Sequence, residues 1–326
     1  MDRLPSISVI LAVLDEAQFI DDTLSDLLGQ VYPGSLEVVV ADGGSKDGTR
    51  EKLAHRASQD DRLLVIENPK KGQAQGLNLA AAEASGEILV RADGHTRYSN
   101  DYVATSVKSL QELKGAVGGR MNPFGSNRFG RAVAAAMNSP LTMGPGRFHH
   151  ATRIEEVDTV YLGAFPKQGF EEIGGFRSFP SGTSEDADFY YRWRRSGRKV
   201  FVNPDIDTRY TPRDSAGALW RQYWRYGQGK SEMLWANGRF PSLRPLAPMA
   251  LVVALVTGLV LGLFAGWWWP LWALTLAWVI LLLVVASSSE EPAHLVMLAA
   301  AIMHLAYGLG ALYGLIRGSG PVPQRG

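Results

Sequence analysis

Residues 7–13, with the sequence ISVILAV, form an apolar run that is rich in β-branched side chains. Such a run is typical of a strand that is buried on both faces of a sheet. The alternation continues with predicted helices at 16–28, 47–58 and 72–85 and predicted strands at 36–41, 63–67 and 87–93, and a later strand is predicted at 156–162. Because strands and helices alternate, the sequence predicts an α/β domain with a doubly wound, mostly parallel sheet.

The distribution of charge divides the chain into two parts. The protein has 326 residues, with 33 basic and 32 acidic side chains, yet Glu290 and Glu291 are the only charged residues between Pro245 and Ile316. A purely soluble protein is therefore excluded, and so is a transporter with many spans, because only about 70 residues are membrane-like. The absence of cysteine excludes a disulfide framework, a thiolate nucleophile and a zinc–thiolate site.

Three apolar segments near the C-terminus are each long enough to cross a bilayer, at about 245–265, 267–286 and 293–316. Three crossings would place the C-terminus outside, whereas Arg317 and Arg325 favour the cytosol, so the topology stays open. The N-terminal residues lack the basic region and long apolar core of a signal peptide. We therefore expect residues 1–244 to stay in the cytoplasm, at the inner (cytoplasmic) membrane.

Basic residues are concentrated just before the first apolar segment. Residues 192–244 contain twelve Lys and Arg and four acidic residues, which gives a net charge of +8. Aromatic side chains alternate with basic ones over 214–240, a pattern typical of helices that lie among lipid headgroups. Nucleic acid is the competing partner for such a patch, but the aromatic residues and the adjoining apolar segments favour lipid. We expect four segments: a cytoplasmic domain at 1–213, amphipathic interface helices at 214–243, transmembrane helices at 244–318 and a tail at 319–326.

Polar residues follow the predicted strands, at the sheet edge where doubly wound folds bind ligands. The second strand ends in ADGGSKDGT, in which Asp42 can accept a hydrogen bond from a base and Gly43 lets the backbone approach a ligand. A capped turn is the alternative, and it explains Ser45 and Asp47 without a ligand.

Asp93 and His95 end the fourth strand, in the sequence RADGH. Residues two apart in a strand share a face, and a carboxylate with an imidazole suits a Mn²⁺ or Mg²⁺ ion that also binds phosphate oxygens. A simple turn is the alternative. Lys71 and Gly72 precede a predicted helix whose N-terminus favours an anion, although exposed lysines are usually only solvated.

Glu185 and Asp186 open a predicted helix in TSEDADFYYRW. Acidic residues at this position are often only caps, but two acids that face a cleft can include a base with a pKa suited to deprotonating a hydroxyl. Residues 139–155, which contain His149 and His150, are predicted to form a mobile loop beside the site.

The order of these motifs resembles the inverting family-2 glycosyltransferases of GT-A fold. The resemblance covers about residues 6–230 and rests on SVILAVLDE, VVVADGGSKDGT, NPKKGQAQGLNLA, RADGH, YLGAFPKQGFEEIGGF, SEDADFYYRW and QYWRYGQGK. The DGH in place of Asp-x-Asp, together with VDTVYLGAF, TPRDS and RYGQGK, is most similar to the succinoglycan-type membrane branch of the family.

The resemblance implies a role for each motif residue. It implies nucleotide-sugar contacts by Ala12, Glu16, Asp42, Gly43, Lys71, Gly72, Asp93, Gln222 and Arg225, metal binding by Asp93 and His95, and acceptor contacts by His149, His150, Arg213, Trp224 and Tyr226. Asp186 would be the general base, with Glu185 as a neighbour that tunes it. Two positions depart from the family pattern: His95 replaces a carboxylate, which leaves the charge of a metal less neutralised, and Tyr226 replaces a Trp.

The implied activity is a metal-dependent, inverting transfer of a hexose or hexuronic acid from a UDP-sugar to a polyprenyl-linked acceptor in polysaccharide biosynthesis. In an alternative, polyprenyl phosphate itself is the acceptor and the product is a phosphosugar lipid, for which Asp186 matters much less. A third possibility is a non-catalytic membrane scaffold that senses nucleotide sugars, against which the acidic residues argue. The sequence leaves the donor sugar, the linkage and the oligomeric state open.

Overall fold

A computed structural model of the chain describes residues 3–144, 146–239 and 245–322. Its centre is a sheet with the strand order β3-β2-β1-β4-β9-β6-β10-β8. The strands are β1 (Ile7–Val13), β2 (Leu36–Asp42), β3 (Leu63–Glu67), β4 (Ile88–Arg91), β6 (Ala116–Gly119), β8 (Glu155–Glu156), β9 (Tyr161–Pro166) and β10 (Val200–Val202). Strands β1 to β4 are parallel, which confirms the predicted doubly wound half, whereas β9 is antiparallel to β4 and β6 and β8 is antiparallel to β10.

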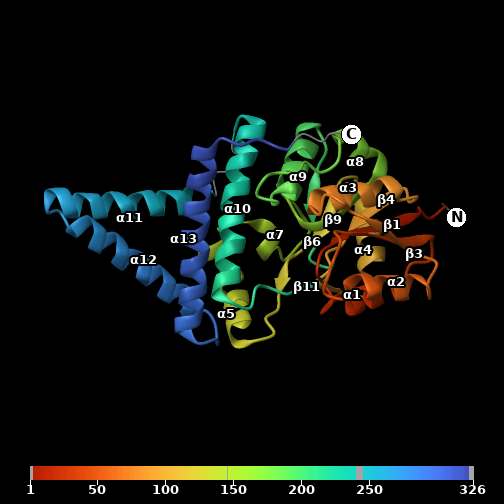
Figure 1. Ribbon diagram of the computed structural model, residues 1–326, viewed down its shortest axis with the longest axis horizontal. Coiled ribbons are helices and arrows are strands. Elements are labelled where there is room, and N and C mark those ends of the chain that lie inside the picture. Colours follow the sequence, from red (N-terminus) through yellow and green to blue (C-terminus); the bar gives the residue numbers. More distant parts are fainter. Residues whose placement is uncertain (1–2, 145, 240–244, 323–326) are drawn as a thin grey trace.

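Helices cover both faces of this sheet (Figure 1). They are α1 (Ile20–Leu28), α2 (Thr49–Ala57), α3 (Gln73–Glu83), α4 (Tyr102–Leu113), α8 (Lys167–Ile173) and α9 (Glu185–Arg195). Alternate residues of β1 enter two different cores: Val9 and Leu11 pack with the α1 and α4 side, while Ile10 packs with the α3 and α9 side. Burial on both faces explains why almost every position of β1 is apolar.

The structure differs from several of the predicted elements. Helix α1 begins at Ile20 rather than at residue 16, because Asp15 has a φ of 56° and the chain turns before the helix. The strand predicted at 156–162 is wrong: its residues divide between β8 at the sheet edge and β9 in the interior. Positive φ angles at Leu162 and Gly163, of 57° and 139°, lie within β9, where its pairing with β6 shifts register.

A second sheet lies beyond the end of β4. It has three short strands in the order β5 (Thr96–Tyr98), β11 (Thr208–Tyr210) and β7 (Asn122–Pro123). The segment predicted as a loop at 139–155 contains two short helices, α6 (Pro140–Met143) and α7 (Arg147–His150), which follow α5 (Arg128–Met137).

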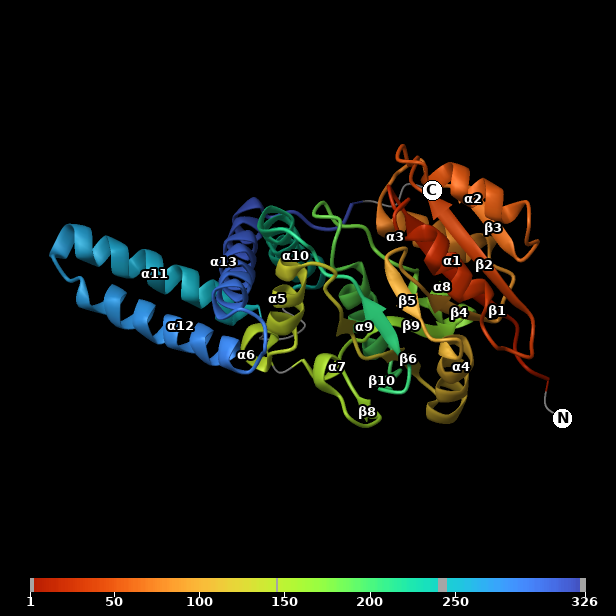
Figure 2. The same cartoon turned by 90° about the horizontal axis from the view of Figure 1, so that it is seen from below.

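The C-terminal third consists of four long helices: α10 (Ala216–Asn237), α11 (Leu246–Ala265), α12 (Trp269–Ser287) and α13 (Ala293–Arg317). The last three are long and apolar enough to cross a membrane, as the sequence predicted. Helices α10 and α13 lie side by side next to the α/β domain, and α11 and α12 project away from them as a hairpin (Figures 1 and 2).

Candidate active site

A cavity of about 1200 Å³ lies at the carboxyl ends of β1 and β4 and continues to the C-terminal helices. Ligands of doubly wound sheets bind at this edge. The structure brings most of the predicted site residues together there, since its lining includes Ala12, Glu16, Lys71, Gly72, Asp93, His95, Glu185, Asp186, Arg213, Gln222, Arg225 and Tyr226. They come from separate segments between Ala12 and Tyr226, which is why no single motif defines the site.

Asp42 and Gly43 are not among the described residues that line this cavity. The Asp42 side chain is buried and accepts hydrogen bonds from its own turn, at 3.1 Å from the Gly44 N–H and 2.5 Å from the Ser45 hydroxyl. Arg50 also lies 3.4 Å from it. These bonds close the turn after β2, whereas α2 begins after Gly48 without a side-chain cap, and a contact between Asp42 and a base stays a prediction.

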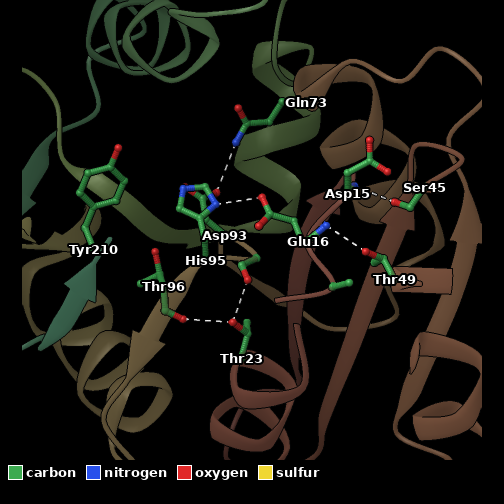
Figure 3. Close-up of polar contacts among 12 residues, drawn as sticks. Asp15, Glu16, Thr23, Ser45, Thr49, Gln73, Asp93, His95, Thr96 and Tyr210 are labelled. Atoms are coloured by element: carbon green, nitrogen blue, oxygen red, sulfur yellow. Dashed lines mark hydrogen bonds and ion pairs between the residues drawn. The ribbon is translucent and has the colours of Figure 1, made fainter. Parts of the chain in front are cut away.

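Side-chain hydroxyls hold the loop after β1 in the conformation that aims Glu16 at the cavity. The backbone N–H of Asp15 donates to the Ser45 hydroxyl and that of Glu16 donates to the Thr49 hydroxyl, both at 2.9 Å (Figure 3). The Glu16 carboxylate then accepts a hydrogen bond of 3.0 Å from Nδ1 of His95. The motif that follows β2 thus orients the residues that follow β1.

Glu16 favours the protonated form of the His95 imidazole. Burial opposes protonation of His95, but the hydrogen bond and charge of Glu16, helped by the charge of Asp93, raise its pKa overall. Figure 3 shows His95 close to Asp93 and pointing toward Glu16. An imidazole held by a carboxylate in this way has a fixed orientation.

Asp93 and His95 are the residues predicted to bind a divalent cation. In the described residues, no group of three or more His, Cys, Asp or Glu is placed to hold a metal ion. Asp93 and His95 nevertheless fit as a pair: one ring nitrogen of His95 bonds to Glu16, which is how metal-binding histidines are commonly oriented, and the other nitrogen is left for a ligand. Phosphate oxygens of a substrate would have to complete the coordination.

Arg91 is a site residue that sequence reasoning missed. It lies in β4 and is 5% exposed, and its Nη2 is 3.4 Å from Oδ1 of Asp93 and 3.1 Å from Oε1 of Glu185. These two carboxylates, together with Asp186, raise the pKa of Arg91 although burial opposes its charge. One signal was available in the sequence, because a charge inside a strand expected to be buried on both faces requires a buried partner.

Glu185 and Asp186 form the first turn of α9 and face the cavity. The residue before them, Ser184, has a φ of 70°, so the chain enters the helix through a sharp turn. Burial and the neighbouring charge of Asp186 raise the pKa of Glu185 to about 7, against the opposing effect of Arg91. Asp186 is less buried, and no ion pair ties it within the described residues. The two acids therefore differ: one is held by a buried arginine, and the other is open to a substrate.

Helix α10 closes the cavity on the side opposite the sheet. Gln222 donates hydrogen bonds of 3.0 Å to the hydroxyls of Tyr210 and Tyr226, and Arg225 donates one of 2.8 Å to the carbonyl of Ser181. Glu232, which is 2% exposed, accepts hydrogen bonds from both the N–H and the hydroxyl of Ser181, at 3.1 and 2.6 Å. The turn that leads into Glu185 is therefore fixed by α10.

Two of the predicted acceptor residues lie away from the described lining of the cavity, and the side chain of a third is not described. Trp224 is not among the described lining residues: its ring lies 5.6 Å from that of Tyr313, and its backbone touches Gly310 of α13. His150 is also absent from that lining, and burial together with the charge of Arg120 lowers its pKa. The side chain of His149 lies outside the described residues. Acceptor contacts by these three stay predictions.

The far end of the cavity is apolar and is lined by the helices that can cross a membrane. Its wall includes Leu251 of α11, Leu274, Ala277, Trp278 and Leu281 of α12, and Met303 and Tyr307 of α13. Leu141 and Met143 of α6 and Phe148 of α7 face the same space. A polar site with perturbed carboxyl groups thus opens into a groove that suits a hydrocarbon chain.

The chain is similar to a known protein family and to several characterised proteins. A family model for glycosyl transferase family 2 matches residues 8–165. The succinoglycan biosynthesis protein ExoA of Rhizobium meliloti (strain 1021) is 31% identical over 256 residues, which cover 77% of each chain.

Two further proteins are more distant. The dolichyl N-acetyl-alpha-D-glucosaminyl phosphate 3-beta-D-2,3-diacetamido-2,3-dideoxy-beta-D-glucuronosyltransferase of Methanococcus voltae is 24% identical over 237 residues, or 70% of this chain and 74% of that protein. Among solved structures, the mannosyltransferase PcManGT from Pyrobaculum calidifontis in complex with GDP-Man and Mn²⁺ has a TM-score of 0.60 at 22% identity. That match covers 96% of this chain and 88% of the other and supports the same GT-A-like fold.

Proposed function

Because this chain belongs to glycosyltransferase family 2, and its site opens toward membrane helices, we propose that it transfers a sugar from a UDP-sugar to a lipid-linked saccharide. The sugar would be a hexose or hexuronic acid, and the product would contribute to polysaccharide biosynthesis. The observation that carries this proposal is the continuity of the cavity, which joins Asp93 and Asp186 to the apolar walls of α11, α12 and α13.

The proposed reaction is a single displacement with inversion. The carboxylate of Asp186 takes the proton of an acceptor hydroxyl, and the hydroxyl oxygen forms a bond to the anomeric carbon. The bond between that carbon and the diphosphate breaks, and its electron pair leaves with UDP. An α-linked donor would give a β-linked product. The open position of Asp186 at the start of α9, without an ion pair in the described residues, supports its assignment as the base.

Negative charge grows on the diphosphate as the bond breaks. Lys71 and Arg225 both line the cavity and would stabilise this charge. A Mn²⁺ or Mg²⁺ ion held by Asp93 and His95 would supply further positive charge when bound. Glu185 would stay bonded to Arg91 and keep the turn before Asp186 in place.

The acceptor would be held at the membrane surface. The apolar groove is consistent with an acceptor that carries a polyprenyl chain. The relative from Methanococcus voltae is named for a dolichyl-linked sugar phosphate. Arg213 and Tyr226 line the cavity between the groove and the acidic residues, where they would contact the phosphate or sugar of the acceptor. The excess of basic residues at 192–244, before α11, supports a catalytic domain on the cytoplasmic side of the inner membrane.

The proposal is tested by comparing the wild-type protein with Asp186→Asn in a transfer assay with labelled UDP-sugars and membrane lipid extracts. We expect the variant to fold and to bind UDP but to lose transfer by at least 100-fold, because general-base catalysis contributes about 10²- to 10⁴-fold. A variant that retains near wild-type turnover would refute the base assignment and favour transfer to polyprenyl phosphate itself. A parallel panel of GDP-sugars tests the nucleotide, and activity with GDP-sugars alone would contradict the UDP assignment.

A further inference from the structure

The three helices that can cross a membrane do not share one direction. Helices α11 and α12 project from the body of the protein as a hairpin, whereas α13 runs across the base of this hairpin, alongside α10 (Figures 1 and 2). If the hairpin enters a bilayer along its length, then α13 lies across that direction.

The three helices also differ in how much of their surface the protein covers. Within the most apolar window of each helix, 22% of α11 and 17% of α12 is buried, but 56% of α13 is buried. The exposed residues of the hairpin are large and apolar, such as Phe264 at 85%, Trp272 at 65% and Leu276 at 62%. The hairpin therefore has the surface of a lipid-exposed segment, whereas most of α13 is covered by protein.

Both ends of α13 contact segments that precede α10 in the chain. Just before the helix, Glu291 forms an ion pair with Arg131 of α5, with 3.0 Å between Oε1 and Nε. Just after it, the backbone N–H of Val322 donates a hydrogen bond of 2.8 Å to the carbonyl of Ser178, in the segment that leads to α9. A helix of 25 residues is about 37 Å long, so if α13 crossed a bilayer, α5 and the segment at Ser178 would have to lie on opposite faces of that bilayer.

Close packing against α10 fixes α13 in this position. A Cβ atom on Gly227 would lie 2.1 Å from the carbonyl oxygen of Tyr307, and one on Gly310 would lie 2.1 Å from that of Trp224. The hydroxyl of Ser231 donates a hydrogen bond of 2.7 Å to the carbonyl of Ala311. Because glycine allows the two backbones to touch, α10 and α13 form one two-helix layer.

From these contacts we infer that the chain crosses the membrane only twice, through α11 and α12, and that α13 lies with α10 along the membrane surface on the side of the α/β domain. Helices of 20 and 19 residues are about 30 and 28 Å long, which matches the hydrocarbon thickness of a bilayer. The Trp267–Trp269 turn then lies in the opposite interface, where tryptophan is favoured.

This topology resolves the conflict in the sequence. Three crossings would separate Arg317 from the catalytic side, whereas two crossings leave it there, as the distribution of positive charge requires. The inference concerns the path of the chain through the membrane, and it does not depend on the sugar, the acceptor or the chemical step.

Single cysteines test the topology directly, because the protein has no cysteine of its own. Gly320→Cys and Val322→Cys report the chain after α13: a Cβ on Gly320 meets open space, and Val322 is 43% exposed. Trp267→Cys, at a position that is 59% exposed, reports the hairpin tip, and Ser58→Cys, on the exposed end of α2, marks the side of the catalytic domain. Each full-length variant is treated with a membrane-impermeant maleimide in sealed inverted and right-side-out vesicles.

We expect Gly320→Cys and Val322→Cys to be labelled in the same vesicles as Ser58→Cys, and Trp267→Cys to be labelled in vesicles of the other orientation. Labelling of both C-terminal positions from the opposite side would show that α13 crosses and would overturn the inference. Labelling of Trp267→Cys from the side of Ser58→Cys would show that the hairpin does not cross and would overturn it as well. The cysteine-free wild-type protein gives the background.

Discussion

The guanidinium of Arg91 joins the two acidic motifs of the site, because its Nη2 lies 3.1 Å from Oε1 of Glu185 and 3.4 Å from Oδ1 of Asp93. Arg91 belongs to the fourth strand, whereas Glu185 lies 94 residues later, at the start of α9. A single buried cation thus fixes the distance between the proposed metal ligand and the turn that carries the proposed base. This relationship leads to the first prediction.

Replacement of Arg91 by glutamine leaves two carboxylates buried without their cation. Removing one partner of a buried ion pair typically costs about 3–5 kcal/mol, so we expect Arg91→Gln to lower the free energy of unfolding by that amount. Denaturation in detergent measures the loss. Arg97→Gln is the matched control, since Arg97 is 54% exposed and pairs with Asp26, and its loss should stay below about 1 kcal/mol. Equal losses for the two variants would argue against the bridging role.

The raised pKa of Glu185 predicts a dependence of stability on pH. Its pKa rises from 4.5 to about 7 on folding, so between these values the folded protein holds a proton that the unfolded chain has released. The free energy of unfolding must therefore fall as the pH rises through this window, by up to about 3 kcal/mol from this group.

Glu185→Gln removes this titration. We expect the unfolding free energy of the wild-type protein, minus that of the variant, to decrease from pH 4.5 to pH 7 and then to level off. Chemical denaturation at several pH values measures the difference. A difference that is constant over the whole range, or that increases with pH, would contradict the raised pKa.

The contact between Glu16 and His95 predicts a specific effect on metal binding. A carboxylate that orients a metal-binding histidine typically contributes 10- to 100-fold to affinity, so Glu16→Gln should raise the Mn²⁺ concentration needed for activity by roughly that factor. Excess Mn²⁺ should restore turnover in this variant but not in Asp93→Asn. The binding of free Mn²⁺, followed by electron paramagnetic resonance, gives a readout independent of catalysis. Unchanged Mn²⁺ binding in Glu16→Gln would argue against the proposed ligand pair.

Glu232 links α10 to the turn before the proposed base, and its removal should separate donor binding from turnover. Glu232→Ala leaves the N–H and hydroxyl of Ser181 without their acceptor, and a hydrogen bond to a charged group contributes about 1.5–3 kcal/mol. We expect a loss of stability in this range and a fall in kcat of about 10- to 100-fold from misplacement of Asp186. Glu232 is not among the described residues that line the cavity. We therefore expect the affinity for UDP to stay within twofold of the wild-type value.

Glu232→Gln provides the control for this prediction. Its amide oxygen can still accept from Ser181, so it should retain most of the turnover that Glu232→Ala loses. If the two variants behaved alike, or if UDP binding fell as much as kcat, a positioning role for Glu232 would be excluded. Calorimetry with UDP and a transfer assay together separate these outcomes.

Local patterns in the sequence were sufficient for most of the elements. The apolar run at 7–13 became β1 with the predicted bounds, and three apolar segments became α11, α12 and α13 within about two residues at each end. The strand predicted at 156–162 was wrong because apolar composition does not show where a strand ends, and the division into β8 and β9 depends on the strands with which each one pairs.

Some residues of the candidate site could be placed from the sequence, and others could not. Motif residues at strand ends, such as Glu16 and Asp93, could be placed from the sequence, because the carboxyl ends of parallel strands meet at one edge. The packing of Trp224 against α13 could not be predicted from the sequence. It follows from a contact between Trp224 and Gly310, which are 86 positions apart.

The sequence by itself determined the fold class, the family and the helices able to cross a membrane, because these depend on the periodicity and polarity of neighbouring residues. Only the tertiary structure decided that Arg91 bridges Asp93 and Glu185, that the polar site continues into an apolar groove, and that the ends of α13 contact α5 and the segment before α9. The physical reason is that a buried charge, a cavity and the direction of a helix are set by partners far away in the chain, which local composition does not contain.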